Sequence, residues 1–409
     1  MSLAVSGIYS NRKAASVMIR ISLGTVISLM TLTAAATFVI TLSAGEKAFN
    51  KKITEIDRLA DKYERLDELD AKVRETFYKD VPENDVMEGM LEGYVAGLGD
   101  RYSVYRSNEE LTAYHDTTSG VYMGIGISIS QNADGYAEIV DVTENGPAEK
   151  KGIEVGDLLL EVEGVSLKAN YREAVDMIAG DVGTSVTLRI RKHDSDTEKK
   201  ISVIRSQIDE ITVQSAFLPD QIGYIYIGKF RTVTVSQFEN ARQELLKQGA
   251  KAFIFDVRNN GGGLLSALER MTDPLLPEGE LAFSYDREGN ASTILTSDAH
   301  FEKMPYVILV NGNTASASEL FACVLRDYAD AVLVGEKTFG KGIMQSTFDL
   351  SGGGVTLTTA TYATGKTECY HEIGLEPDVL AVYDPDAEKD NQIQAAIDTA
   401  KDLISKQED

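Results

Sequence analysis

The sequence predicts an α/β protein of several domains with a membrane helix at its amino end. Three observations support this prediction. Residues 21–42 form an uncharged apolar stretch, the pattern changes from helical spacing to short strands near Gly120, and a strand–helix–strand succession begins near Ile222. A chain of 409 residues exceeds the size of one ordinary core, so we expect two or three separate cores.

The composition argues against a nucleic-acid partner. The chain is 43% hydrophobic and 25% charged, as globular proteins are, and its formal net charge is −24. Phosphate backbones and anionic lipid headgroups would repel such a chain. The two cysteines, Cys323 and Cys369, are too few for a disulfide framework, and we interpret both as free thiols.

The apolar stretch 21–42 predicts a membrane anchor. Its 22 residues, at a rise of about 1.5 Å each, span about 33 Å, which suffices for a hydrocarbon core of about 30 Å. Arg12, Lys13 and Arg20 precede it and should stay in the cytoplasm, so we expect a single pass through the cell membrane with the remainder of the chain extracytoplasmic. A cleaved signal peptide is the alternative, because small residues follow at 43–45.

The sequence predicts a helical region at residues 46–119. Between Ile53 and Val73, apolar residues recur at steps of three and four among charged residues, which indicates an amphipathic arm. The arm either lies on its own domain or pairs with a second copy; dense charges on both flanks favour pairing, and hence a homodimer. A second helical stretch, Glu83–Leu98, precedes an extended or looped segment at 102–105.

The region 120–205 has an ordered set of motifs. A glycine-alternating loop is followed by a Gly-Pro-Ala helix start, a Gly-Asp turn, a helix near Tyr171–Ala179 and a last strand, Val186–Arg191. This order resembles that of a PDZ domain. The resemblance implies a domain that binds the carboxyl terminus of a protein or peptide.

The residues expected to bind that terminus are Gly124, Ile125, Gly126 and Ile127. The loop can turn backbone N–H groups inward to receive a carboxylate, and the following strand can offer its open edge to an extended peptide. The isoleucines would favour an apolar terminal residue. The plainer alternative is that the glycines only form a tight start to the strand.

The third region predicts a parallel sheet. A strand at 223–227, a helix at Val235–Gln248 and a buried strand at 252–257 follow one another, and the last of these leads into the glycine run 261–263. Bare backbone at a strand end can approach a reacting carbonyl group closely and present an N–H to it. Alone, the glycines would be interpreted as a flexible loop.

The next buried strand, Tyr306–Val310, leads into a helix that we expect to start near Ser316. A serine at such a turn lies beside helix N–H groups, whose partial positive charge favours an oxyanion. An ordinary helix cap is the alternative interpretation of Ser316.

The whole constellation resembles the carboxyl-terminal processing peptidases, also called tail-specific proteases. The matching segments, with 25 residues from Ser316 to Lys341, are residues 256–263, 314–319, 335–345 and 374–379. The resemblance implies a serine endopeptidase with a crotonase/ClpP-like α/β core and without metal or cofactor. The implied domains are an anchor (1–45), a helical region (46–119), a PDZ domain (120–205), a peptidase core (206–382) and a carboxyl-terminal helix (383–409).

The resemblance makes Ser316 the nucleophile, Lys341 the general base and Gln345 the residue that positions the lysine. A lysine of pKa about 10.4 can act as a base near neutral pH only if burial lowers its pKa by several units. Gln345 follows Lys341 by four residues, which on a helix would place both on one face. For the oxyanion we expect the N–H groups of Ala317 and Gly262.

Other interpretations stay open. A Ser-His-Asp hydrolase could use one of four histidines, which are His115, His193, His300 and His371. Cys369 with His371 would suit a cysteine protease, and the sheet with its glycine loop would suit an acyl-CoA enzyme. A different class is a catalytically silent PDZ receptor for protein tails. Asp327 would lie about 16 Å along a continuous helix from Ser316, so we do not expect it to take part directly.

Overall fold

The computed structural model describes residues 23–298, 300, 301 and 303–408 of the chain. Contacts divide the chain into two compact units, residues 1–86 and residues 87–409. The positive residues Arg12, Lys13 and Arg20, and the start of the predicted membrane span, lie outside the described residues.

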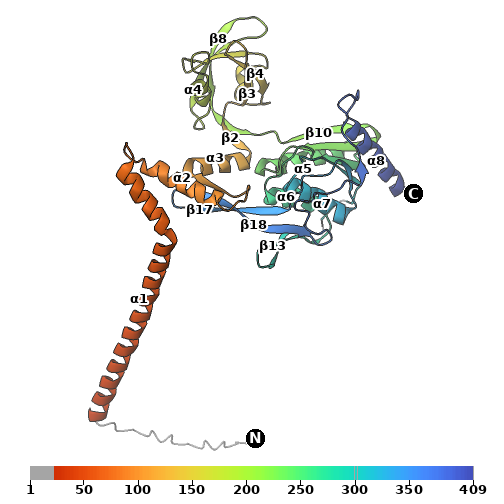
Figure 1. Cartoon of the computed structure of the whole chain (residues 1–409). Coiled ribbons are helices and arrows are strands. Elements are labelled where there is room, and N and C mark those ends of the chain that lie inside the picture. Colours follow the sequence, from red (N-terminus) through yellow and green to blue (C-terminus); the bar gives the residue numbers. More distant parts are fainter. Residues whose placement is uncertain (1–22, 299, 302, 409) are drawn as a thin grey trace, which may run out of the picture. The chain divides into compact units, whose positions relative to one another are not determined.

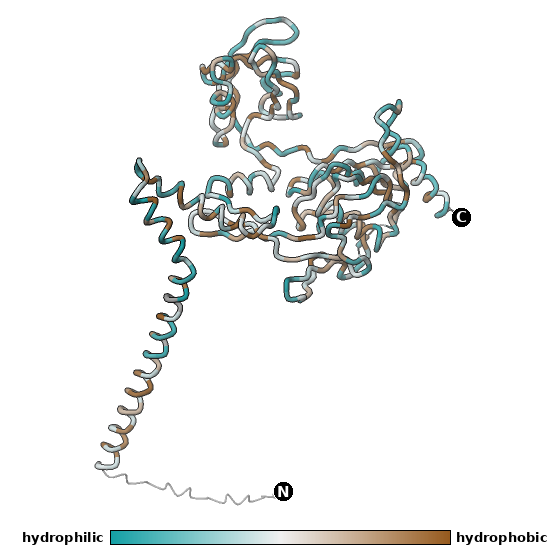
Figure 2. The backbone as a smooth tube through the Cα atoms, in the orientation of Figure 1, coloured by the Kyte–Doolittle hydropathy of each residue, from teal (hydrophilic) through white to brown (hydrophobic). Residues whose placement is uncertain are grey.

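The first unit is dominated by helix α1 (Leu23–Thr76), a single helix of 54 residues (Figure 1). By length and composition alone, the beginning of this helix could cross a membrane. A signal sequence passes the same test, so these criteria do not distinguish the two. Figure 2 shows the change from apolar residues near the start of α1 to hydrophilic residues further along. The helix does not break at residue 45, where the sequence predicted the end of the anchor.

The predicted PDZ region is a small β domain with its own core. Its six-stranded sheet has the order β3-β4-β5-β7-β8 with β6 beside β5, and β2 pairs separately with β9. Its elements are β2 (Val121–Gly124), β3 (Ile127–Gln131), β4 (Ala137–Val142), η1 (Glu149–Lys151), β5 (Leu158–Val162), β6 (Val165–Ser166), α4 (Tyr171–Asp176), β7 (Ser185–Arg191), β8 (Glu198–Ile204) and β9 (Ser206–Asp209). Alternate residues such as Ile139, Leu159 and Leu188 fill the core.

One strand of this domain differs from the prediction. The sequence placed the last strand at 186–191, whereas β8 follows it and pairs with β7 along its whole length. Most of β8 is exposed, and it begins with Glu198, Lys199 and Lys200, so the buried alternation that marks a strand in a sequence is absent there.

The larger α/β region is built on a six-stranded sheet of order β10-β11-β12-β15-β16-β19. The strands from β11 onward are parallel, as the strand–helix–strand pattern predicted, and β10 joins antiparallel at one edge. Its elements are β10 (Val213–Leu218), η2 (Pro219–Gln221), β11 (Ile222–Ile227), α5 (Thr232–Lys247), β12 (Ala252–Asp256), α6 (Leu265–Thr272), η3 (Asp273–Leu275), β15 (Tyr306–Val310), α7 (Ala317–Ala329), β16 (Val332–Gly335), β19 (Val379–Leu380) and α8 (Asn391–Glu408).

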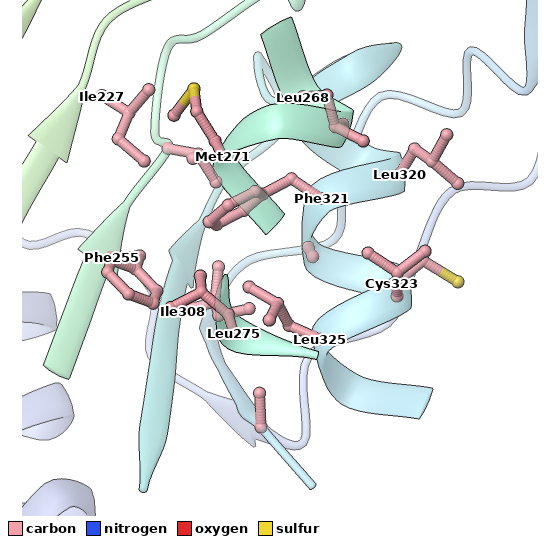
Figure 3. Packing of buried hydrophobic residues seen from close by; sticks show 14 of the residues in the cluster. Ile227, Phe255, Leu268, Met271, Leu275, Ile308, Leu320, Phe321, Cys323 and Leu325 are labelled. Carbon is pink, nitrogen blue, oxygen red and sulfur yellow. The ribbon is translucent and has the colours of Figure 1, made fainter. Parts of the chain in front are cut away.

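Helices cover both faces of this sheet, which explains why β12 and β15 are buried along their whole length. On one face, Phe255 and Ile308 pack with residues of α5, α6 and α7; on the other, Ile254 packs with residues of α8. Figure 3 shows Phe321 of α7 pointing into the first of these layers, where its ring centroid lies 5.6 Å from that of Phe255. Burying one such phenylalanine contributes about 1.5–3 kcal/mol, so this layer fixes the position of α7.

A second sheet joins distant parts of the chain. Strand β18 pairs with β1, β13 and β17, and β13 pairs with β14. Its strands are β1 (Val104–Ser107), β13 (Gly279–Tyr285), β14 (Ala291–Ser297), β17 (Ile343–Leu350) and β18 (Gly353–Thr364). In the chain, helix α2 (Glu83–Ala96) precedes β1 and helix α3 (Asn108–Ser119) follows it. The pairing of Val104 with Thr356 brings the segment just before β1 to the carboxyl-terminal part of the chain.

Candidate active site

Ser316 stands at the turn between β15 and α7. Its backbone angles are φ 59° and ψ −122°, a conformation that costs a residue other than glycine about 1–3 kcal/mol. The turn is held in place by buried hydrogen bonds. The Thr314 hydroxyl donates to the Val257 carbonyl at 2.9 Å, and the Ala315 N–H donates to the Asn260 carbonyl at 3.0 Å. These bonds fix the serine against the end of β12.

Gly262 lies directly against this turn. A Cβ atom added to it would lie 2.8 Å from the Ala315 carbonyl oxygen and 2.9 Å from both the Ala317 nitrogen and the Ser316 Cβ. Its φ of 101° also suits glycine alone. The predicted neighbours Gly262 and Ala317 are therefore together at the serine.

The role predicted for Gly262 needs a correction. Its N–H donates to the side-chain oxygen of Asn260 at 2.9 Å, and the amide of that buried asparagine donates in turn to the Ile227 carbonyl at 2.8 Å. A donor so occupied is not aimed at an oxyanion. In this arrangement Gly262 supplies close approach, which any side chain would prevent.

Glu319 links the two halves of the site, and the sequence analysis missed it. Its side chain is fully buried, and its Oε2 accepts the N–H of Ser316 at 2.9 Å and the N–H of Lys341 at 2.7 Å. Its Oε1 accepts the N–H of Gly340 at 2.7 Å and the hydroxyl of Thr338. One carboxylate thus ties the turn that carries the serine to the loop that carries the lysine. The pattern of serine followed three residues later by glutamate, before an apolar helix, could have identified it.

Lys341 lies half-buried in the loop between β16 and β17. Burial lowers the pKa of its amine, and the nearby charge of Arg101 lowers it further, while Asp100 and Glu319 oppose the change. Its Nζ lies 4.5 Å from the ring centroid of Tyr102. Among the hydrogen bonds of the described residues, none joins this Nζ to the Ser316 hydroxyl.

Tyr362 of β18 contacts both sides of the site. Its buried hydroxyl donates to the backbone carbonyl of Lys341 at 2.7 Å. Burial raises the pKa of this phenol, and the neighbouring side chains of Tyr370 and Ser316 oppose that rise. The tyrosine therefore holds the loop that carries the lysine.

The prediction that Gln345 lies one helical turn after Lys341 is wrong. The segment is not helical: Gln345 belongs to strand β17, beside an irregularity in its pairing with β18. Glycines at 340 and 342 disfavour a helix, and the long partner strand β18 recruits the chain into the sheet. The side-chain nitrogen of Gln345 is buried and has no hydrogen-bond partner in the described part of the chain.

The residues predicted to bind a peptide terminus lie at the beginning of the PDZ sheet. Gly124 ends β2, Gly126 has a φ of 77°, and Ile127 begins β3, which is an edge strand of its sheet. The side chain of Ile125 is 1% exposed and belongs to the domain core. The side chain of Ile125 is thus not available to a ligand, while Ile127 is half-buried.

The other candidates make no hydrogen bond to the serine among the described residues, although Cys369 donates to the carbonyl of Gly342 at 3.4 Å, beside the loop of Lys341. No hydrogen bond of the described residues joins a histidine to Ser316. Asp327 instead accepts hydrogen bonds from the hydroxyls of Thr364 and Thr367, so it fastens α7 to the segment after β18. Both cysteines are free, and burial raises the pKa of the Cys323 thiol to about 12, which makes it unreactive.

One cluster in the PDZ region has ligand types that suit a metal, namely Glu154, Asp157 and His193. The Nζ of Lys192 lies 2.7 Å from a carboxylate oxygen of Glu154 and 2.8 Å from one of Asp157. The ammonium group of Lys192 thus occupies the position that a metal ion would take between these carboxylates.

A strained serine at a strand-to-helix turn, with a glycine packed against it, is typical of enzymes that transfer acyl groups. Residues 221–381 match the model of peptidase family S41, and residues 138–192 match the model of the PDZ domain. The protein is thus a serine peptidase with a PDZ domain.

Related proteins identify the family more closely. The chain is 31% identical over 323 residues to the carboxy-terminal processing protease CtpA of Bacillus subtilis (strain 168), covering 78% of this chain and 69% of the relative. It is 32% identical over 322 residues to a carboxyl-terminal-processing protease of Synechocystis sp., covering 75% of each. A solved structure of a photosystem II D1 C-terminal processing protease matches 81% of this chain and 90% of its own, at 28% identity and a TM-score of 0.46. The chain belongs to the carboxyl-terminal processing protease family.

Proposed function

We propose that this protein is a membrane-anchored endopeptidase that binds protein carboxyl termini with its PDZ domain and hydrolyses peptide bonds with Ser316 and Lys341. The observation that supports this assignment best is the bridge made by Glu319, whose Oε2 accepts the backbone N–H groups of both residues. Two residues 25 positions apart are held together by a single buried carboxylate.

The reaction begins as the Ser316 hydroxyl oxygen attacks the carbonyl carbon of the peptide bond and its proton passes to the neutral amine of Lys341. The resulting ammonium group then gives that proton to the leaving nitrogen, the C–N bond breaks, and an ester to Ser316 remains. A water molecule attacks this ester after giving a proton to the amine, which returns it to the serine as the new carboxyl terminus leaves. The lowered pKa of Lys341 keeps part of the lysine neutral for the first step.

The oxyanion formed in each step needs hydrogen-bond donors. Helix α7 begins at Ala317, and the first N–H groups of a helix have no acceptor within it, so we assign the Ala317 N–H to this role. Gly262 leaves room for the substrate carbonyl beside it. Gln345 remains our candidate for positioning the lysine, because its amide oxygen can accept a hydrogen bond from the amine.

For substrate capture, the PDZ domain would take the terminal carboxylate on the backbone of Gly124, Ile125 and Gly126. The peptide would extend along β3, whose edge position leaves one side without a partner strand in the described sheet. Ile127 would then favour an apolar terminal side chain.

The surrounding architecture completes the proposal. The parallel sheet, with its glycine turn after β12 and helix after β15, suits a crotonase/ClpP-like core, and a charge of −24 disfavours nucleic acid. The apolar start of α1 would anchor the protein to the cell membrane with the protease outside; a cleaved signal sequence is the alternative. Leu59, Tyr63 and Leu69 remain exposed along α1, which favours pairing of two copies through the arm.

Cleavage of an unstructured peptide with an apolar carboxyl terminus tests the assignment. Ser316→Ala should lower the cleavage rate by at least about 10⁴-fold, and Lys341→Ala by about 10²–10⁴-fold. The matched controls are Ser318→Ala, and Lys337→Ala, whose amine is paired with Glu376 at 2.7 Å. Both controls should retain most of the activity.

Labelling with a serine-directed phosphonate distinguishes the enzyme from a silent receptor. An active serine should be labelled in the wild type and in both controls, but not in Ser316→Ala. A Lys341→Ala variant that cleaves at the wild-type rate would exclude lysine as the base and reopen the question of a histidine.

A further inference from the structure

A short turn before β1 lies against the proposed base. The Ser103 hydroxyl accepts the N–H of Thr358 at 3.1 Å, which fastens the turn to β18. Asp100 closes the turn by accepting the Ser103 hydroxyl at 2.6 Å and the Tyr102 N–H at 3.1 Å. These hydrogen bonds therefore hold the turn in a defined position at the site, although more than 200 residues separate it from Lys341 in the sequence.

The turn places two cations on one aromatic ring. The Lys341 Nζ lies 4.5 Å from the ring centroid of Tyr102, and the guanidinium carbon of Arg101 lies 4.6 Å from the same centroid. Arg101 also donates to the Tyr102 hydroxyl and lies 5.5 Å from the ring centroid of Phe339, two residues before the lysine. Both distances are within the range of a cation–π contact, so the ring can hold both groups.

Arg101 has no carboxylate partner among the ion pairs of the described residues, although the chain is strongly acidic. A guanidinium group stays charged throughout the working pH range, whereas an amine can lose its proton. Repulsion between two positive groups on one ring is relieved when the lysine is neutral.

The other charges around the lysine act in both directions. Burial and Arg101 lower the pKa of Lys341, whereas Asp100 from the same turn and Glu319 from α7 raise it. Further titratable residues packed against its loop are Tyr102, Tyr362, Cys369, His371 and Glu372, the last two through their backbone. Arg101 is a cation that lowers the pKa of Lys341, so its removal should raise that pKa.

We propose that Arg101 and Tyr102 are positioning residues for the general base: the Tyr102 ring holds the Lys341 amine, and the Arg101 guanidinium opposes its protonation. The proposal rests on the proposed function, because it concerns the lysine as base. We assign neither residue a bond-making or proton-transfer step; both act through Lys341.

The test is the pH dependence of peptide cleavage, expressed as kcat/KM, in Arg101→Gln and Arg101→Lys. Without the guanidinium charge the amine takes up a proton more readily, so the rising limb of the profile moves to higher pH. At pH 7 the kcat/KM of the glutamine variant should be roughly two- to five-fold below that of the wild type. At pH values above the rising limb, where the lysine is neutral in both proteins, the two kcat/KM values should be equal. Arg101→Lys keeps the charge and should follow the wild-type profile.

Salt and the ring supply two further readouts. Arg101 is exposed, so the difference between Arg101→Gln and the wild type should shrink as ionic strength rises. Tyr102→Leu removes the shared ring, so the shift of the pH profile caused by Arg101→Gln should be smaller in this background than in the wild type. Tyr102→Phe keeps the ring, so the shift caused by Arg101→Gln should keep its full size in that background.

A wild-type profile in Arg101→Gln would overturn the proposal, and so would an equal loss of activity at every pH, which would indicate a merely structural role. The Lys341→Ala variant separates this failure from failure of the proposed function. If that variant is inactive while Arg101→Gln is unchanged, only the inference about Arg101 fails. If Lys341→Ala is fully active, the Ser–Lys assignment itself fails.

Discussion

The serine half of the site (Gly262, Ser316 and Ala317) and its lysine half (Lys341, with Arg101 and Tyr102) are built in different ways. The serine stands between a fully buried strand and a helix whose first nine residues are all buried, Ala317–Leu325. The lysine lies in a half-buried loop, and an exposed arginine from a distant segment stands beside it. A local packing pattern thus fixes the nucleophile, whereas long-range pairing assembles the surroundings of the base.

Replacing Gly262 by alanine should disable the serine half alone. The new Cβ would meet backbone atoms at 2.8–2.9 Å, at a φ that disfavours side chains, so the turn must shift. We expect kcat to fall by about 10²–10³-fold, because the shifted turn misplaces the Ala317 N–H that we assign to the oxyanion, with no movement of the pH profile along the pH axis.

Gly261→Ala is the matched control, because a Cβ there meets nothing within 4 Å. It should retain most of the activity. Equal losses in the two variants would show that general disturbance of the loop, and not close approach at Gly262, causes the effect.

Replacing Glu319 by glutamine should damage both halves together. A neutral amide keeps one acceptor oxygen and turns an NH₂ group toward backbone donors, so buried N–H groups lose their partner. We expect activity to fall by about ten- to a hundred-fold and the free energy of unfolding by about 2–4 kcal/mol. Urea unfolding and peptide cleavage measure the two effects.

Glu376→Gln, on an exposed side chain, is the control for Glu319 and should change neither quantity appreciably. Loss of activity at Glu319→Gln without loss of stability would argue against a carboxylate that holds two segments together.

Replacing Tyr362 by phenylalanine should affect mainly the lysine half. The Lys341 carbonyl would lose its donor, at a cost of about 1–3 kcal/mol in the stability of the loop, and we expect a three- to ten-fold loss of kcat. Tyr285→Phe on the neighbouring strand β13 is the control. A wild-type kcat for Tyr362→Phe would mean that this hydrogen bond does not fix the lysine.

The serine half could be predicted from the sequence because its signals are local. The apolar runs of β12 and β15, the glycines after β12 and the apolar helix after Ser316 are each contiguous. Their arrangement in a parallel sheet brings the strand ends together, and the structure places Gly262 beside Ser316.

The lysine half could not be predicted in the same way. The helical interpretation of Gln345 failed because a spacing of four residues carries no information once the chain pairs in a sheet, where it corresponds to about 13 Å. Arg101 and Tyr102 reach the site through the pairing of β1 with β18, residues some 250 positions apart, and no local pattern marks such a contact. Glu319, which joins the two halves, did have a local signal, because it follows the serine by three residues at the start of a helix.

The pH dependence of Ser316 phosphonylation, compared between the wild type and Lys341→Ala, tests the Ser–Lys pair most directly. Because the pKa of Lys341 is lowered and its neutral form is the base, the wild-type rate should rise with pH through a single ionisation below that of a free lysine. In Lys341→Ala the rate should be at least about 10²-fold lower and should lack this ionisation. An unchanged rate and profile in Lys341→Ala would contradict the account, because another group would then be taking the serine proton.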